Sequence, residues 1–235
     1  MSLKLFKKNL YELADPVKAK ILQRFFKTGK GQYGEGDKFL GVMVPEQRAL
    51  VKKYWESLSL REIDALLKSK YHEERLSALL CLVEKFRHAG GEKVQTKIYN
   101  FYLRHARFIN NWDLADLSAP KIAGRYLLDK DRSILYKLAE SKNLWERRIA
   151  VLATFAFINK GDSKDALKIS TMLLSDQRDL IHKATGWCLR EIGKRCGEKI
   201  LLDFLDRHVR AMPRTMLRYA IERLPEKVRK TYLNA

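Results

Sequence analysis

The sequence is short of the residues that cross-link a chain, bind metals or interrupt helices. Of its 235 residues only five are Pro and three are Cys, and the cysteines form no C-x-x-C pair. A disulfide framework and a zinc cage are therefore not indicated. The five histidines are scattered without a His-x-x-x-His pair, so we expect neither a metal nor another cofactor.

Long apolar runs are absent too. No run of about 18 uncharged apolar residues could span a bilayer. The N-terminal MSLKLFKKNLYELA alternates charged and apolar residues where a signal peptide would carry an apolar core. We expect a cytosolic protein without a membrane partner. Hydrophobic residues still make up 46% of the chain, which is enough to build a folded core.

Acidic residues are in the minority, with 28 Asp and Glu against 47 Lys and Arg, so the formal net charge is +19. Such a surplus favours binding to a polyanion, because released counterions drive the association of cations with phosphates. Aromatic faces near phosphates suggest a partner with bases or sugars. Charge alone leaves any nucleic acid possible. The four tryptophans in this basic background are Trp55, Trp112, Trp145 and Trp187.

Apolar residues recur at intervals of three and four, as in Leu76, Leu79, Leu80 and Val83, and β-type alternation is nearly absent. This period predicts an all-α protein. From residue 60 onward the expected helices form pairs that repeat about every 35 to 40 residues, which is the spacing of helical-repeat proteins. The expected pairs are 60–69 with 72–88, 91–106 with 112–128, 131–140 with 144–159, 162–174 with 177–194, and 197–208 with 213–223.

This spacing is typical of a HEAT-like α-solenoid, in which antiparallel helix pairs stack and leave a curved face, here a concave basic one. An irregular helical bundle is the alternative. The length of the chain is compatible with one elongated domain or two compact ones.

The glycine-rich stretch 28–41 contains Gly29-Lys-Gly31-Gln-Tyr-Gly34, which fits the pattern G-x-G-x-x-G. A dinucleotide site is excluded because the preceding segment AKILQRFFKT is helical and no βαβ unit follows. We expect a flexible connection between two helices, with Pro45 in the first turn of the second. Lys30 and Lys38 are candidate phosphate contacts, the alternative being that the stretch is only a linker.

Two tryptophans and their neighbours carry candidate chemistry. Trp112 and Asp116 are four residues apart and share one helix face, while Asp113 faces elsewhere and is placed to serve the helix N-terminus. Trp145 is interpreted as a packing residue. Gly186 precedes Trp187 in mid-helix, where Gly is disfavoured, which indicates a close approach by a helix or a ligand.

In a stacked solenoid, Trp112, Asp116, Arg148 and Trp187 would surround a common cleft. Indole faces can bracket a sugar or base, and a guanidinium can bind phosphate oxygens. A carboxylate can oppose the positive charge of an oxocarbenium-like state. This set of groups suits hydrolysis at a deoxyribose C1′. A base alkylated at a ring nitrogen is already a cationic leaving group, so one carboxylate would suffice.

The sequence resembles the AlkD family of alkylpurine DNA glycosylases, which are HEAT-like proteins. The resemblance rests on FLGVMVPEQR from Phe39, NWDLADLSAP from Asn111, NLWERRIAVL from Asn143 and IHKATGWCLREIGK from Ile181. It implies one DNA alkylation repair domain over residues 1–235. It also implies a monomer that excises cationic N3- and N7-alkylated purines from double-stranded DNA in a bacterial-type cytosol, nucleoid-associated when bound to DNA.

The resemblance also implies roles for individual residues. Asp116 matches the catalytic carboxylate, Trp112 and Trp187 match the aromatic walls against the deoxyribose, and Arg148 matches the cleft arginine. In this family the lesion is not drawn into a deep base pocket. The residues then expected to hold the DNA backbone are Arg48, Lys52 and Lys53.

Two other functions remain open at this point. The YGEGD segment at Tyr33 to Asp37 departs from the best-characterised glycosylase, and some relatives bind DNA without excising bases. A non-catalytic protein that binds damaged or branched DNA is therefore the first alternative. A HEAT-like protein-protein scaffold is the second, which the charge disfavours. No lysine stands out as a Schiff-base nucleophile, so an enzyme of this kind is expected to be monofunctional.

Overall fold

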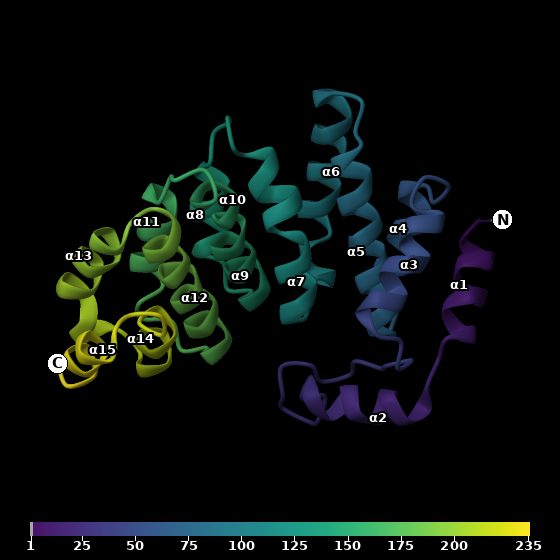
Figure 1. The fold of residues 1–235 in the computed structure, drawn as a ribbon. Coiled ribbons are helices and arrows are strands. Elements are labelled where there is room, and N and C mark those ends of the chain that lie inside the picture. The colour runs from purple at the N-terminus through teal and green to yellow at the C-terminus, as the bar shows by residue number, and fades with distance from the viewer. Residues whose placement is uncertain (1) are drawn as a thin grey trace. The chain divides into compact units, whose positions relative to one another are not determined.

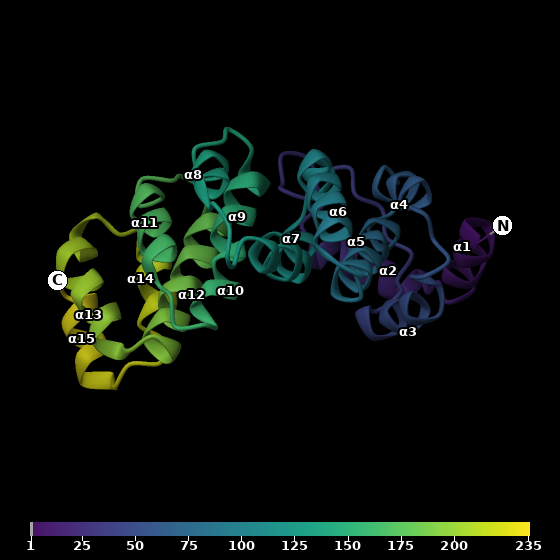
Figure 2. The ribbon, with the colours of Figure 1, turned by 90° about the horizontal axis from the view of Figure 1, so that it is seen from above.

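A computed structural model describes residues 2–235 and confirms the all-α fold (Figures 1 and 2). Within these residues the backbone forms helices and turns, with one isolated β-bridge between Lys38 and Tyr71. The chain divides into two compact units, the first ending at Ser118 and the second beginning at Ala119. No helix in the described part of the chain is long and apolar enough to cross a bilayer.

The first unit is organised around α5, which is buried along most of its length and contacts α3, α4, α6 and α7. Helix α2 lies crosswise to α3 and α5 in Figure 1. The helices of this unit are α1 (Ser2–Glu12), α2 (Pro16–Phe25), α3 (Val44–Tyr54), α4 (Leu60–Leu67), α5 (His72–Arg87), α6 (Glu92–Arg104) and α7 (Trp112–Ser118), with a 3-10 turn at Ala106–Phe108.

Helix α2 begins where Asp15 caps it. The Asp15 carboxylate accepts hydrogen bonds from the backbone N–H groups of Val17 and Lys18, and Pro16 occupies the first turn, where its missing N–H costs nothing. None of the α2 residues is buried. The helix is held to the unit through the segments that follow it, beginning with the buried ring of Phe26.

The connection over residues 28–41 joins α2 to α3, as predicted, with Pro45 in the first turn of α3. Sequence analysis predicts a flexible connection, but this stretch forms hydrogen bonds with α5 and the residues just before it. The backbone of Lys38 exchanges hydrogen bonds with the backbone around Tyr71, and the N–H groups of Leu40 and Gly41 donate to the buried Glu73 carboxylate at 3.0 and 2.8 Å. The glycine-rich stretch is therefore an ordered part of the first unit.

The second unit is organised around α12, which contacts α9, α10, α11, α13 and α14. A turn of π-helix at Pro120–Gly124 opens the unit. The helices are α8 (Ser133–Ala139), α9 (Leu144–Ala153), α10 (Phe155–Ile158), α11 (Lys164–Met172), α12 (Asp179–Arg195), α13 (Glu198–His208), α14 (Arg214–Ala220) and α15 (Glu226–Leu233), with a 3-10 turn at Val209–Ala211.

Gly186 marks a close approach of helices, as its mid-helix position predicts. A Cβ atom at Gly186 would lie 2.4 Å from the carbonyl oxygen of Met216 and 2.5 Å from the Cβ of Tyr219, both on α14. The neighbour at this glycine is thus a helix of the same unit. The backbones of α12 and α14 can approach this closely only because position 186 has no side chain.

The predicted helix pairs correspond to observed helices, but two of the predicted helices are interrupted. The segment 112–128 is α7 as far as Ser118, after which Pro120 removes a backbone donor and a turn of π-helix follows. The segment 144–159 divides at Thr154, whose hydroxyl donates to the carbonyl of Val151 and competes with the helical pattern.

Candidate functional site

The start of α7 carries the first two candidate residues, Trp112 and Asp116. The Asn111 side-chain oxygen accepts a hydrogen bond of 2.8 Å from the backbone N–H of Trp112, which satisfies one of the free donors at the helix N-terminus. Trp112 and Asp116 are both half-buried. One helical turn separates them, so the indole and the carboxylate belong to the same side of α7, as the sequence predicts.

The indole of Trp112 lies in a cluster of aromatic rings at the end of α2. Phe26 stacks on it with a centroid distance of 5.2 Å and an interplanar angle of 25°, and Phe25 meets it edge-on at 5.9 Å. The indole Nε1 donates a hydrogen bond of 3.2 Å to the hydroxyl of Tyr33. Phe26 thus covers one face of the indole, while the half-buried ring keeps part of its surface open to solvent.

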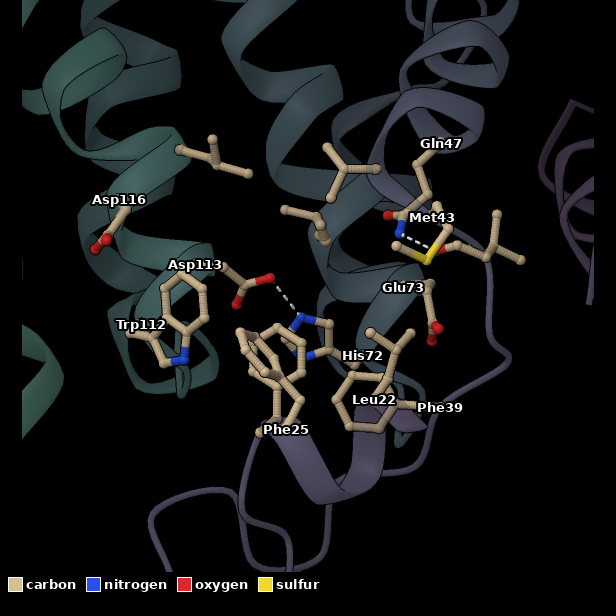
Figure 3. Close-up of a pocket in the computed structure, with 15 residues that line it drawn as sticks. Leu22, Phe25, Phe39, Met43, Gln47, His72, Glu73, Trp112, Asp113 and Asp116 are labelled. Carbon is tan, nitrogen blue, oxygen red and sulfur yellow. Dashed lines mark hydrogen bonds and ion pairs between the residues drawn. The ribbon is translucent and has the colours of Figure 1, made fainter. Parts of the chain in front are cut away.

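Asp116 lies at the edge of this cluster, and in Figure 3 its carboxylate points away from His72. Its charge is felt by Tyr102 on α6. Burial raises the pKa of the Tyr102 hydroxyl well above its usual range, and the nearby Asp116 carboxylate adds to this effect. The carboxylate therefore lies close to the core of the first unit, although Asp116 as a whole residue is only half-buried.

A cavity of about 330 Å³ adjoins the cluster and lies between α2, α3, α5 and α7 (Figure 3). Its walls are mostly apolar and aromatic. Asp113 and His72 contribute polar atoms, and Trp112 forms one wall. The aromatic and largest apolar side chains of the lining are Leu22, Phe25, Phe26, Phe39, Leu76 and Trp112.

In the wall of the cavity, His72 links α5 to α7 through a buried ionic network. Its Nε2 lies 2.8 Å from a carboxylate oxygen of Asp113, and its Nδ1 lies 3.4 Å from Asp37. Arg75 pairs with the other oxygen of Asp37 at 2.6 Å. Burial by itself lowers the pKa of His72, but the charge of Asp113 and the hydrogen bonds to both carboxylates outweigh it and raise this pKa to about 9.

Asp113 has two roles in the structure. One carboxylate oxygen accepts the N–H of Leu114 at the start of α7, consistent with the expected service at the helix N-terminus. The other oxygen binds His72, a partner 41 positions away that no local pattern predicts.

The other two candidates, Arg148 and Trp187, belong to the second unit. Arg148 on α9 is buried, with 5% of its surface exposed, and its guanidinium donates a hydrogen bond of 2.5 Å to the carbonyl of Leu180 at the start of α12. Trp187 on α12 is half-buried and meets Phe155 edge-on at 4.6 Å. Trp145 is buried, which confirms it as a packing residue.

The five basic residues proposed as phosphate contacts all lie on the surface of the first unit. Arg48, Lys52 and Lys53 are exposed on α3, and Lys30 and Lys38 are exposed in the glycine-rich stretch. Each ammonium or guanidinium is accordingly available to a phosphate group.

Sequence reasoning missed the residues that hold Trp112 and the start of α7, namely Tyr33, Asp37 and His72. One signal was present. A run of polar residues, His72-Glu-Glu-Arg75, precedes the apolar part of α5, and all four prove to be buried. A buried polar run needs partners, and those partners are distant in sequence.

The chain matches the family model described as DNA alkylation repair enzyme over residues 6–224, and so through both units. The chain belongs to the DNA alkylation repair enzyme family. Membership gives the protein a role in the repair of alkylated DNA and makes DNA its partner.

A solved structure is similar in fold. It is that of a predicted DNA alkylation repair enzyme from Enterococcus faecalis, with a TM-score of 0.70 and 19% sequence identity, covering 91% of this chain and 97% of that one. At this identity the likeness concerns the fold. A comparison with curated proteins found no match.

Proposed function

We propose that this member of the family is a monofunctional DNA glycosylase. Its substrate would be duplex DNA that contains cationic N3- or N7-alkylated purines, and the bond it hydrolyses would join the base to the deoxyribose. The observation that carries the proposal is the pairing of a half-buried carboxylate residue, Asp116, with the half-buried Trp112 one helical turn earlier.

The chemistry requires little more than this pair. As the bond between C1′ and the ring nitrogen breaks, the bonding electrons go to the alkylated base, which leaves as a neutral molecule, and positive charge develops on the sugar. A carboxylate stabilises this oxocarbenium-like state electrostatically. Water then adds to C1′ and gives its proton to Asp116 and from there to solvent. No separate acid is needed, because the leaving base is already cationic.

Binding would rest on charge and on aromatic faces. The exposed Arg48, Lys52, Lys53, Lys30 and Lys38 would contact phosphates, and Trp112 would lie against the sugar of the lesion. We propose that Trp187 on α12 and Arg148 on α9 also take part in binding the damaged DNA. Arg148 is suited to a fixed position, since its bond to the Leu180 carbonyl holds the guanidinium in place.

An excision assay tests the proposal. Purified protein is incubated with duplex DNA that carries N3-methyladenine and N7-methylguanine, and the released bases are quantified. The Asp116→Asn variant should release them at least about 100-fold more slowly, the usual effect of removing an electrostatic stabiliser of a transition state. Asp129→Asn is the matched control, because Asp129 is an exposed aspartate of the second unit.

The same assay addresses the second candidate, a protein that binds damaged or branched DNA without excision. This candidate is favoured by the Tyr33–Asp37 segment, which is the part of the site where the chain departs from the glycosylase pattern. If the protein binds the DNA tightly but releases no base, or if Asp116→Asn releases the base as fast as wild type, the glycosylase hypothesis is rejected in favour of a protein that only binds DNA.

A further inference from the structure

The glycine-rich stretch reaches the start of α7 at two points. The Tyr33 hydroxyl accepts the indole N–H of Trp112 at 3.2 Å, across 79 positions of sequence. The Asp37 carboxylate accepts a hydrogen bond of 3.3 Å from the Asn111 side chain, whose oxygen in turn binds the N–H of Trp112. A segment with the composition of a linker therefore contacts the ring of the proposed sugar-binding residue directly and its backbone N–H through the side chain of Asn111.

We propose that the stretch 28–41 is the positioning element of the site. In this role Tyr33 sets the orientation of the Trp112 ring, and Asp37 holds, through Asn111 and His72, the first turn of the helix that carries Asp116. The inference rests on the proposed function for its catalytic consequence, and on the contacts alone for its structural part.

Tyr33 controls the one polar atom of the indole. Trp offers a single hydrogen-bond donor, so a partner of the Nε1–H group sets the direction in which that edge of the ring points. Phe26 already stacks on one face of the ring. A stacked neighbour still permits the ring to slide in its plane, and the bond to the Tyr33 hydroxyl removes that freedom. The two contacts together fix which part of the indole meets a ligand.

Asp37 acts on the backbone. Helix α7 has only seven residues, too few to be stable without external contacts. Asn111 is fully buried and uses both ends of its amide, donating to Asp37 and accepting from Trp112. His72, which pairs with Asp37, holds the next residue of the helix, Asp113. Loss of the Asp37 charge would loosen both links to the first turn of α7.

The glycines allow the stretch to make these contacts. A Cβ atom at Gly34 would lie 2.5 Å from the carbonyl oxygen of Phe26, so the chain next to Tyr33 passes too close to the end of α2 for a side chain. Gly36 has φ +86°, a conformation that other residues rarely adopt, immediately before Asp37. The positions from which Tyr33 and Asp37 reach the start of α7 thus depend on the glycines between them.

The decisive variant is Tyr33→Phe, which removes the hydroxyl and keeps the ring. The position of Trp112 is followed by ¹⁹F NMR of protein labelled with 5-fluorotryptophan, its resonance assigned with Trp112→Phe. We expect Tyr33→Phe to shift or broaden this resonance and to lower the single-turnover excision rate roughly ten- to a hundredfold, the cost of a small misplacement of a substrate-positioning group. The melting temperature should change little.

Tyr54→Phe is the matched control. The Tyr54 hydroxyl accepts a hydrogen bond of 2.7 Å from Asn9 in the same unit, so the control also removes one side-chain hydrogen bond. It should leave the Trp112 resonance and the excision rate unchanged. The proposal is overturned if Tyr33→Phe leaves the Trp112 resonance where it is, or if Tyr54→Phe moves it equally.

Asp37→Asn tests the second contact, with Asp64→Asn as its control. Asp64 also pairs with a histidine, His105, at 2.8 Å, and does so away from α7. Only Asp37→Asn should shift the Trp112 resonance and slow excision; a resonance that does not move, or moves equally in both variants, overturns the role of Asp37. If Asp37→Asn does not fold, Tyr33→Phe still decides the proposal.

The two proposals fail in different ways. If the wild-type protein releases no base, the glycosylase assignment fails, yet the ¹⁹F measurement still decides whether Tyr33 positions Trp112. If the wild-type protein excises the base and Tyr33→Phe does not shift the Trp112 resonance, the glycosylase assignment is supported and the proposed positioning role of the stretch 28–41 is wrong.

Discussion

The imidazole of His72 donates toward a carboxylate oxygen of Asp113 across 2.8 Å, and both side chains are buried. This pair joins the first residue of α5 to the second residue of α7. On its other side His72 faces Asp37, which is shared with Arg75. The start of the helix that carries Asp116 is therefore tied to the centre of the first unit by charge as well as by packing.

The stability of the protein should depend on pH through His72. Its folded pKa, about 9, is raised above the ordinary value of 6.5. The stabilisation is therefore complete below about pH 6.5 and disappears as the pH rises through 9. One pKa unit corresponds to about 1.4 kcal/mol, so the shift from 6.5 to about 9 sets an upper bound of roughly 3 to 4 kcal/mol on this contribution to the free energy of unfolding. Urea unfolding at pH 6.5 and 9.5 measures the decrease.

His72→Gln should be less stable than wild type at pH 6.5 and should approach it at pH 9.5, because the amide carries no charge to lose. His88→Gln is the control, since His88 is exposed at the C-terminal end of the same helix, α5. An equal pH dependence in wild type and His72→Gln would show that His72 is not the responsible group.

Gly186→Ala should destabilise the second unit. The new Cβ would lie 2.4 Å from the Met216 carbonyl oxygen, so α12 and α14 must separate. Alanine gains about 1 kcal/mol of helix propensity over glycine, and overpacking of this kind typically costs about 1–3 kcal/mol. We expect a net fall in melting temperature. Gly90→Ala is the control, because a Cβ there meets nothing within 4 Å; equal melting temperatures for the two variants would contradict the prediction.

Trp112 and Trp145 should respond in opposite ways to replacement by Phe. Trp112 is half-buried, so Trp112→Phe should lower the excision rate at least about tenfold with a small change in melting temperature. Trp145 is buried, so Trp145→Phe should lower the melting temperature and leave the excision rate of the folded protein close to wild type. Thermal unfolding and single-turnover excision are measured on both. If Trp112→Phe and Trp145→Phe lower the excision rate to a similar extent, Trp112 is a packing residue like Trp145.

The basic residues of α3 should contribute to the salt dependence of DNA binding. Removing one cation that neutralises a phosphate lowers the slope of log K against log salt by about 0.9. Replacing Arg48, Lys52 and Lys53 by Gln should therefore reduce this slope by up to about 3 units, measured by fluorescence anisotropy between roughly 50 and 200 mM salt. If DNA binding does not weaken with salt, binding is not driven by charge, and the alternative function as a protein-protein scaffold is favoured.

A second triple variant controls for net charge. Lys227, Arg229 and Lys230 are exposed on α15, and their replacement by Gln removes the same three charges. An equal reduction of the slope in both triple variants would show that α3 has no special part in contacting DNA.

Much of the fold followed from local pattern. The three- and four-residue spacing of Leu76, Leu79, Leu80 and Val83 predicted a helix, and these residues are buried in α5. Gly186 predicted a close contact and is in contact with α14. The predicted ends were less accurate where one residue acted against the pattern, as at Pro120, because a missing donor or a competing hydroxyl is invisible to hydrophobic periodicity.

In the candidate site too, contacts between neighbouring residues could be predicted from the sequence, and contacts between distant residues could not. Helical geometry alone places Asp116 one turn from Trp112, so their pairing could be predicted. Nothing in the sequence pairs Tyr33 with Trp112 or Asp37 with Asn111. The grouping of Trp112 and Asp116 with Arg148 and Trp187 around one lesion remains a prediction, tested by the excision rates of their variants.

The sequence by itself determined the helical class, the pairing of helices, the basic character of the surface and the spacing of indole and carboxylate on one helix. These are properties of neighbouring residues, which period and composition report directly. Only the tertiary structure decided which side chains hold that helix. Tyr33 and Trp112 are 79 positions apart, and they meet because the helices between them pack in one particular way, which no local pattern encodes.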